Sequence, residues 1–93
     1  MVTKARLWPD TPTHPGEILG DELEAREQSV EEFAKRTGLE TGIIQRLLSG
    51  ELPITADIAW ELESALGDVS ARFWMSLQAD YDLGMERLRR KAG

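Results

Sequence analysis

Apolar residues recur at intervals of three and four along most of the chain, separated by polar residues. This spacing is typical of amphipathic helices and predicts five of them, so we expect an all-α fold. Within each helix the apolar residues should face a common core. From the first helix to the last, these residues are Ile18, Leu19, Leu23 and Ala25; Val30, Phe33 and Ala34; Ile43, Ile44, Leu47 and Leu48; Ile58, Leu62, Ala65 and Leu66; and Trp74, Leu77, Tyr81, Met85 and Leu88.

Residues that start or stop helices lie between these apolar groups. Pro15 suits the first position of a helix, because the N–H that proline lacks would have no partner there. Ser29 and Glu32 have the spacing of a capping box, in which each side chain accepts a hydrogen bond from the backbone N–H of the other. Further start signals are Thr55 and Ser70, and further stop signals are Gly38, Gly50 and Gly67.

Two short helices within residues 30–49 are joined by a turn at Gly38, which is the pattern of a helix-turn-helix. This motif places its second helix in the major groove of DNA. We therefore divide the chain into an N-terminal extended arm (1–14), a helix-turn-helix DNA-binding domain (15–68) and a C-terminal dimerisation or packing helix (69–93).

The second helix of the motif is expected to begin near Glu40 and to end near Ser49. Its apolar residues face inward, which leaves an outer face for DNA. Arginine can make two hydrogen bonds to guanine, and glutamine can do the same with adenine. The alternative is that this outer face is only solvated. Its residues are Thr41, Gly42, Gln45 and Arg46.

The apolar stripe of the last helix is longer than a chain of 93 residues needs for its own core. We therefore expect it to pack partly against a second copy of the chain. Trp60 and Trp74 are interpreted as core or dimer residues, since both lie in amphipathic helices. Trp8 anchors the arm either on its own domain or on a protein partner, and His14 is interpreted as a helix cap or a surface residue. The predicted dimerisation residues are Trp74, Leu77, Tyr81, Met85 and Leu88.

Composition narrows the function. The net charge is -6, and residues 15–28 and 55–68 are strongly acidic. Those two segments should avoid DNA, while an acidic body suits a basic protein partner. The chain has no cysteine, no apolar stretch long enough for a membrane span, no metal-ligand cluster and no glycine-rich phosphate loop. We expect a cytoplasmic protein that is not an enzyme, with no cofactor, no membrane contact and no small-molecule substrate.

Four motifs lie in order around the helix-turn-helix: His14-Pro15-Gly16-Glu17-Ile18-Leu19, Ile54-Thr55-x-Asp57-x-Ala59, Leu62-x-x-Ala65-Leu66-Gly67 and Phe73-Trp74-x-x-Leu77-Gln78-x-x-Tyr81-Asp82-Leu83. Together they resemble the HigA-type antitoxins, small members of the Cro and lambda-repressor helix-turn-helix family. The resemblance covers residues 14–88, and it implies a five-helix lambda-repressor-like fold with a long C-terminal helix and a homodimer.

The resemblance also implies a function. The chain would neutralise a small, basic, ribosome-dependent mRNA-cleaving toxin, and as a dimer it would bind double-stranded operator DNA in its own operon promoter as a transcriptional repressor. Carried over position by position, base contacts fall on Thr41, Gly42, Gln45 and Arg46, and contacts to the DNA backbone fall on Lys35 and Arg36.

Three positions depart from the family pattern and support an alternative. Val30 stands where glutamine is often found, Glu40 stands where serine or threonine is often found, and Glu51 lies in a loop that is commonly basic. Each change removes a phosphate contact or adds repulsion. The alternative is a toxin-inhibiting protein with degenerate DNA binding, and a third hypothesis is a free-standing helix-turn-helix transcriptional regulator without a toxin partner.

Overall fold

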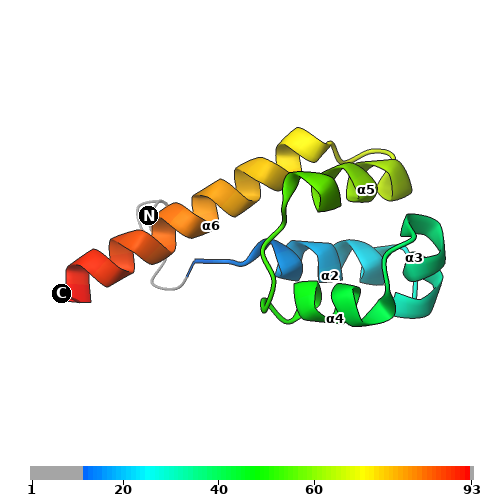
Figure 1. Ribbon diagram of the computed structural model, residues 1–93, viewed down its shortest axis with the longest axis horizontal. Helices are drawn as coiled ribbons and strands as arrows, with labels where there is room; N and C mark the ends of the chain where they lie inside the picture. Colours follow the sequence, from blue (N-terminus) through cyan, green and yellow to red (C-terminus); the bar gives the residue numbers. More distant parts are fainter. Residues whose placement is uncertain (1–11, 93) are drawn as a thin grey trace.

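The computed structural model describes residues 12–92 of the 93-residue chain, and these residues form five helices and no strand (Figure 1). The predicted all-α fold is confirmed. Most of the predicted arm lies outside the described residues, and so does Trp8. The helices are α2 (Pro15–Ala25), α3 (Val30–Thr37), α4 (Thr41–Leu48), α5 (Ala56–Leu66) and α6 (Ala71–Ala92).

Capping hydrogen bonds start the helices where the sequence places the cap residues. The hydroxyl of Ser29 accepts a bond of 3.1 Å from the backbone N–H of Glu32, and the Glu32 carboxylate accepts one of 2.8 Å from the N–H of Ser29. Thr55 caps α5 with a bond of 3.4 Å, and Ser70 accepts one of 3.1 Å from the N–H of Phe73 at the start of α6. The predicted capping box is therefore confirmed.

The helices pack around a single core (Figure 1). α4 contacts α2 and α3, while α5 contacts α3 and α6. α4 and α5 consequently lie on opposite sides of α2 in Figure 1. The buried apolar residues are Leu19, Leu23, Phe33, Ile44, Leu47, Ile54, Ala59, Leu62, Ala65, Leu66, Ala71 and Trp74.

Burial corrects the predicted roles of Trp74 in dimerisation and of Ala25 in the core, and it decides between two alternatives for Trp60. Trp74 is 0% exposed, so it belongs to the core of its own chain and is not available to a second copy. Trp60 is 65% exposed, which rules out the core alternative and leaves the dimer alternative as a prediction. α5 turns Ala59 into the core, and the next residue along a helix lies about 100° away, which directs Trp60 outward. Ala25, the last residue of α2, is also exposed.

The first half of α6 packs on the core, and the second half extends away from the body (Figure 1). Its buried residues are Ala71, Trp74 and Gln78, all in the first half. The amide oxygen of Gln78 accepts a bond of 2.8 Å from the backbone N–H of Ile54, and its NH₂ group donates one of 3.0 Å to Asp82. This side chain fixes the segment that connects α4 to α5. None of the helices in residues 12–92 is long and apolar enough to cross a membrane.

Candidate nucleic-acid interface

The predicted base-reading residues all lie on the outer face of α4. Thr41, Gly42, Gln45 and Arg46 are exposed, while Ile44 and Leu47 on the other side are fully buried; Ile43 and Leu48 lie half-buried at the edges. A Cβ atom built on Gly42 would meet no atom within 4 Å. Packing within the chain therefore does not require glycine at position 42, and a ligand could approach the backbone closely there.

The turn before α4 is held by one buried hydroxyl. Thr37 is 7% exposed; its Oγ donates a bond of 3.0 Å to the carbonyl of Phe33 and accepts one of 3.0 Å from the N–H of Leu39. Gly38 follows with φ of 80°, the left-handed conformation that ends α3. Thr37 was not singled out from the sequence, although a Thr-Gly pair at a helix end is a signal for such a turn.

A close backbone contact fixes α4 against α2. A Cβ atom at Gly16 would lie 1.8 Å from the carbonyl oxygen of Leu47, so only glycine allows the start of α2 to approach the end of α4. Nδ1 of His14 accepts a bond of 2.8 Å from the N–H of Gly16, and the ring of His14 contacts that of Tyr81 edge to face at 4.8 Å. His14 is therefore a helix cap, and it is buried rather than on the surface.

The three basic residues predicted to contact DNA differ in their surroundings. Arg46 pairs with Glu51 at 3.6 Å, and both side chains are more than half exposed. Arg36 donates a bond of 3.1 Å to the carbonyl of Ala65 near the end of α5, which leaves its remaining N–H groups for other partners. Lys35 is exposed, and no carboxylate in residues 12–92 forms an ion pair with it.

The pairing of Arg46 with Glu51 is a weak constraint. An exposed ion pair of this kind contributes about 0–1 kcal/mol. A bidentate contact between arginine and guanine contributes about 1–3 kcal/mol to base discrimination. The free energy lost when Arg46 leaves Glu51 is therefore smaller than the free energy gained from a base contact. Glu51 and the exposed Glu40 nevertheless place negative charge at both ends of α4.

The predicted dimerisation stripe divides into two parts. Leu77 packs against the core and Tyr81 contacts His14, so part of the surface of each side chain is covered by its own chain. Met85 is 43% exposed, Leu88 is half-buried, and both lie in the protruding half of α6. Leu83, which is 59% exposed, lies in the same half and was not predicted as a dimerisation residue.

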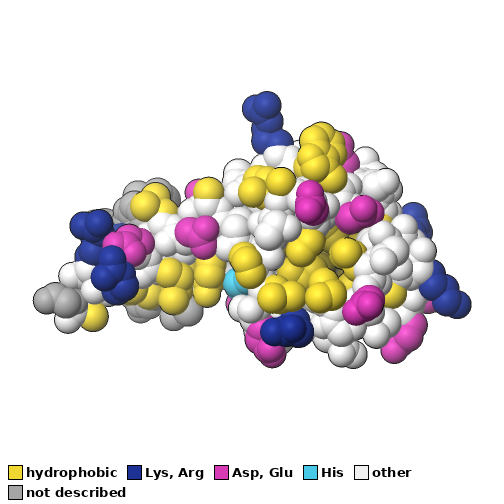
Figure 2. All heavy atoms as spheres, viewed as in Figure 1, with side chains coloured by type: hydrophobic (Ala, Val, Ile, Leu, Met, Phe, Trp, Pro, Cys, Tyr) yellow, Lys and Arg dark blue, Asp and Glu magenta, His cyan; other side chains and the backbone are white. Residues whose placement is uncertain are grey.

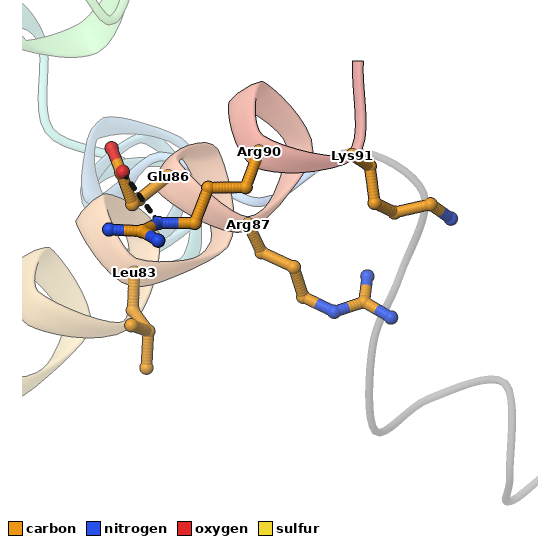
Figure 3. Close-up of a pocket in the computed structure, with 5 residues that line it drawn as sticks. All are labelled: Leu83, Glu86, Arg87, Arg90 and Lys91. Atoms are coloured by element: carbon orange, nitrogen blue, oxygen red, sulfur yellow. Dashed lines mark hydrogen bonds and ion pairs between the residues drawn. The ribbon is translucent and has the colours of Figure 1, made fainter. Parts of the chain in front are cut away.

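Charged side chains surround this protruding part of α6. Figure 3 shows Leu83 beside Glu86, Arg87, Arg90 and Lys91, which together line a shallow hollow. Glu86 accepts hydrogen bonds from Arg89 and Arg90, the latter at 2.8 Å. The bond from Arg89 is the main reason that the pKa of Glu86 is lower than usual. No group of His, Cys, Asp and Glu residues that could hold a metal ion occurs in the described part of the chain.

The chain is similar to known proteins in sequence and in structure. No protein-family model matches the chain. The virulence-associated protein A′ of Dichelobacter nodosus is 32% identical over 72 residues, which cover 77% of this chain and 63% of that protein. This chain therefore matches less than two thirds of that relative.

Solved structures are similar over more of their length. An addiction-module antidote protein of the HigA family from Coxiella burnetii is 36% identical, with a TM-score of 0.77 over 87% of this chain and 90% of that one. The antitoxin HigA of Pseudomonas aeruginosa, solved with the higBA promoter, is 33% identical, with a TM-score of 0.79 over 87% of this chain and 88% of that one.

Proposed function

Because the chain belongs to the HigA family of antitoxins, within the Xre class of helix-turn-helix proteins, we propose that it acts as both a repressor and a toxin inhibitor. As a homodimer it binds the promoter of its own operon. It also neutralises a small, basic toxin that cleaves mRNA on the ribosome. The observation that carries the DNA-binding half is the exposed outer face of α4 on a rigid support.

In the proposed complex, α4 enters the major groove with its N-terminal end toward the base edges. Gln45 contacts adenine and Arg46 contacts guanine, after Arg46 has left Glu51. Gly42 allows close approach of the helix, Lys35 contacts a phosphate, and Arg36 does so after it has released the carbonyl of Ala65. Two copies of α4 in a dimer lie about 34 Å apart, which is one turn of B-DNA, and read the two halves of a palindrome.

The negative charge of the chain lowers its affinity for DNA of any sequence. Lys35 and Arg36 neutralise few phosphates, and the net charge of -6 opposes approach to DNA. Non-specific binding should therefore be weak. Base contacts then supply an unusually large share of the affinity, which favours a high ratio of specific to random binding.

A second candidate function is toxin inhibition with degenerate DNA binding. The exposed carboxylates of Glu40 and Glu51 favour it, because they place negative charge at both ends of α4 and repel DNA phosphates. The two candidates differ in one measurable property. The proposed repressor binds its promoter much more tightly than random DNA, whereas a degenerate protein binds both equally weakly.

The experiment is a mobility shift of the purified chain on the promoter of its own operon, with a shuffled sequence of the same length as the control. Growth is scored in parallel when the chain is co-expressed with the product of the adjacent small open reading frame. The proposal predicts a shift on the promoter alone and rescue of growth. Equal binding to both DNAs would contradict the repressor half, and absence of rescue would contradict the antitoxin half.

A further inference from the structure

The outer face of α5 carries an exposed tryptophan among carboxylates. Trp60 is 65% exposed, the most exposed of the large apolar side chains in the described part of the chain. Asp57, Glu61 and Ser64 are also exposed and lie on the same side of the helix, at positions −3, +1 and +4 relative to Trp60. We call these four residues the Trp60 face. Trp60, Glu61 and Ser64, together with Glu63, line a shallow hollow.

Folding does not account for this face. The inner side of α5 is complete without Trp60, because Ala59, Leu62, Ala65 and Leu66 fill the core. Asp57 and Glu61 form no ion pair within residues 12–92. Tryptophan is enriched at protein–protein interfaces, so we interpret an exposed tryptophan beside unpaired carboxylates as a contact surface for a partner.

The chemistry of the face selects a basic partner. A tryptophan ring is the best aromatic acceptor for a lysine or arginine cation placed over it. The carboxylates of Asp57 and Glu61 attract the same cation, whereas the other two acidic residues of 55–68 are used within the chain: Glu63 accepts a bond from the N–H of Ala71, and Asp68 pairs with Arg26. Figure 2 shows acidic side chains over α5; a basic side chain projects at the top of the view, above the first half of α6. DNA is excluded as the partner here, since phosphates would be repelled.

We propose that the Trp60 face is the docking surface for the basic toxin, with an arginine or lysine of the toxin stacked on Trp60 and paired with Asp57 or Glu61. This inference rests on the proposed antitoxin function and assigns its protein-binding site. The contacts within the chain leave the outer face of α5 uncovered, and α5 lies across α2 from the proposed DNA-reading helix α4 (Figure 1). Toxin and operator therefore bind the same molecule at once.

The test uses the product of the adjacent small open reading frame as the probe and measures its affinity for the full-length chain by calorimetry. The variants are Trp60→Ser and Glu61→Lys. Glu24→Lys is the matched control, because Glu24 is an exposed glutamate on another helix, α2. We expect Trp60→Ser and Glu61→Lys each to weaken binding about ten-fold or more, as is common for a central interface tryptophan and its charged neighbours. Glu24→Lys should bind like the wild type.

Each variant is also checked for folding, assembly and DNA binding. Thermal unfolding, light scattering and operator affinity should match those of the wild type, since the face lies outside the core and away from α4. Wild-type affinity in both Trp60→Ser and Glu61→Lys would overturn the inference. So would an equal loss in Glu24→Lys, which would place the toxin on α2, or a change of oligomeric state in Trp60→Ser, which would make the face a contact between copies.

A second readout uses the operator complex. Adding the probe protein to the wild-type chain on DNA should produce a more slowly migrating complex, whereas the Trp60→Ser variant on DNA should not change its migration. Release of DNA by the probe would contradict binding on the side opposite α4. If the wild-type chain neither binds the probe nor rescues growth, the antitoxin function itself fails, and this result differs from the loss of binding in the variants alone.

Discussion

The substitution Gly16→Ala tests the contact that positions α4. A Cβ atom at residue 16 would lie 1.8 Å from the carbonyl oxygen of Leu47 and 2.9 Å from its carbonyl carbon. Both atoms belong to the backbone, so no side-chain rotation relieves the overlap. α2 and α4 must move apart, and the hydrogen bond from the N–H of Gly16 to His14, which is 2.8 Å long, is strained by the same movement.

The magnitude follows from two opposing effects. Overpacking of a well-packed site costs about 1–3 kcal/mol, and a backbone clash belongs at the upper end of that range. Alanine recovers at most about 1 kcal/mol over glycine through its helix propensity. We expect a net loss of about 2 kcal/mol in the free energy of unfolding. For a domain of this size, that loss lowers Tm by roughly 8–16 °C.

The assay is thermal unfolding followed by circular dichroism at a fixed protein concentration, with Gly42→Ala as the control. Position 42 has no atom within 4 Å of its Cβ site, so this second substitution should raise stability by up to about 1 kcal/mol. Gly16→Ala should also weaken operator binding, because α4 loses its position. A Tm for Gly16→Ala equal to or above that of the wild type would refute the reasoning.

Three further outcomes are expected. Gln78→Leu removes the acceptor of the buried N–H of Ile54 and should cost about 1–3 kcal/mol in urea unfolding; an unchanged midpoint would show that this bond is dispensable. Glu51→Gln removes the partner of Arg46 and one negative charge beside DNA, so operator affinity should rise about two- to five-fold in a mobility shift, and a decrease would contradict the proposed geometry. Because the pKa of Glu86 is lowered mainly by Arg89, its stabilisation of α6 is present at neutral pH and is lost as acid protonates it. Circular dichroism at falling pH should show a larger loss of helix in the wild type than in Glu86→Gln, because the other carboxylates titrate in both proteins and this one titrates only in the wild type.

Local signals in the sequence predicted much of the fold. The capping box of Ser29 and Glu32, the caps at Thr55 and Ser70, and the stop at Gly38 act between residues close in the chain. Such signals can be read without knowing the tertiary structure. The same locality explains why the outer face of α4 was predicted, since helical periodicity alone determines which residues share a side.

Contacts between distant residues were not predictable in this way. His14 meets Tyr81, Gln78 binds the N–H of Ile54, and the carboxylate of Glu63 accepts a bond of 3.1 Å from the N–H of Ala71 to cap α6. Each contact depends on how the helices cross, which periodicity does not specify.

The burial of the tryptophans was also decided by packing. Trp60 and Trp74 both lie in amphipathic helices, yet one is exposed and the other has no exposed surface. On α5 the small residue Ala59 is buried in the core, and the next residue, Trp60, is directed outward. The pairing of Arg46 with Glu51 likewise depends on how the loop after α4 folds back.

The most direct test measures whether the removal of Arg46 and the change of one operator base pair have coupled effects on binding affinity. The wild type and Arg46→Ala are compared on the operator and on operators with a single G·C pair changed to A·T, with the exposed Arg72→Ala on α6 as the control. We predict that the wild type loses about 5- to 150-fold in affinity at one guanine of each half-site, as expected for one bidentate contact, and that Arg46→Ala is insensitive to that change. If Arg46→Ala keeps full affinity and the same sensitivity at every position, α4 does not read the operator as proposed.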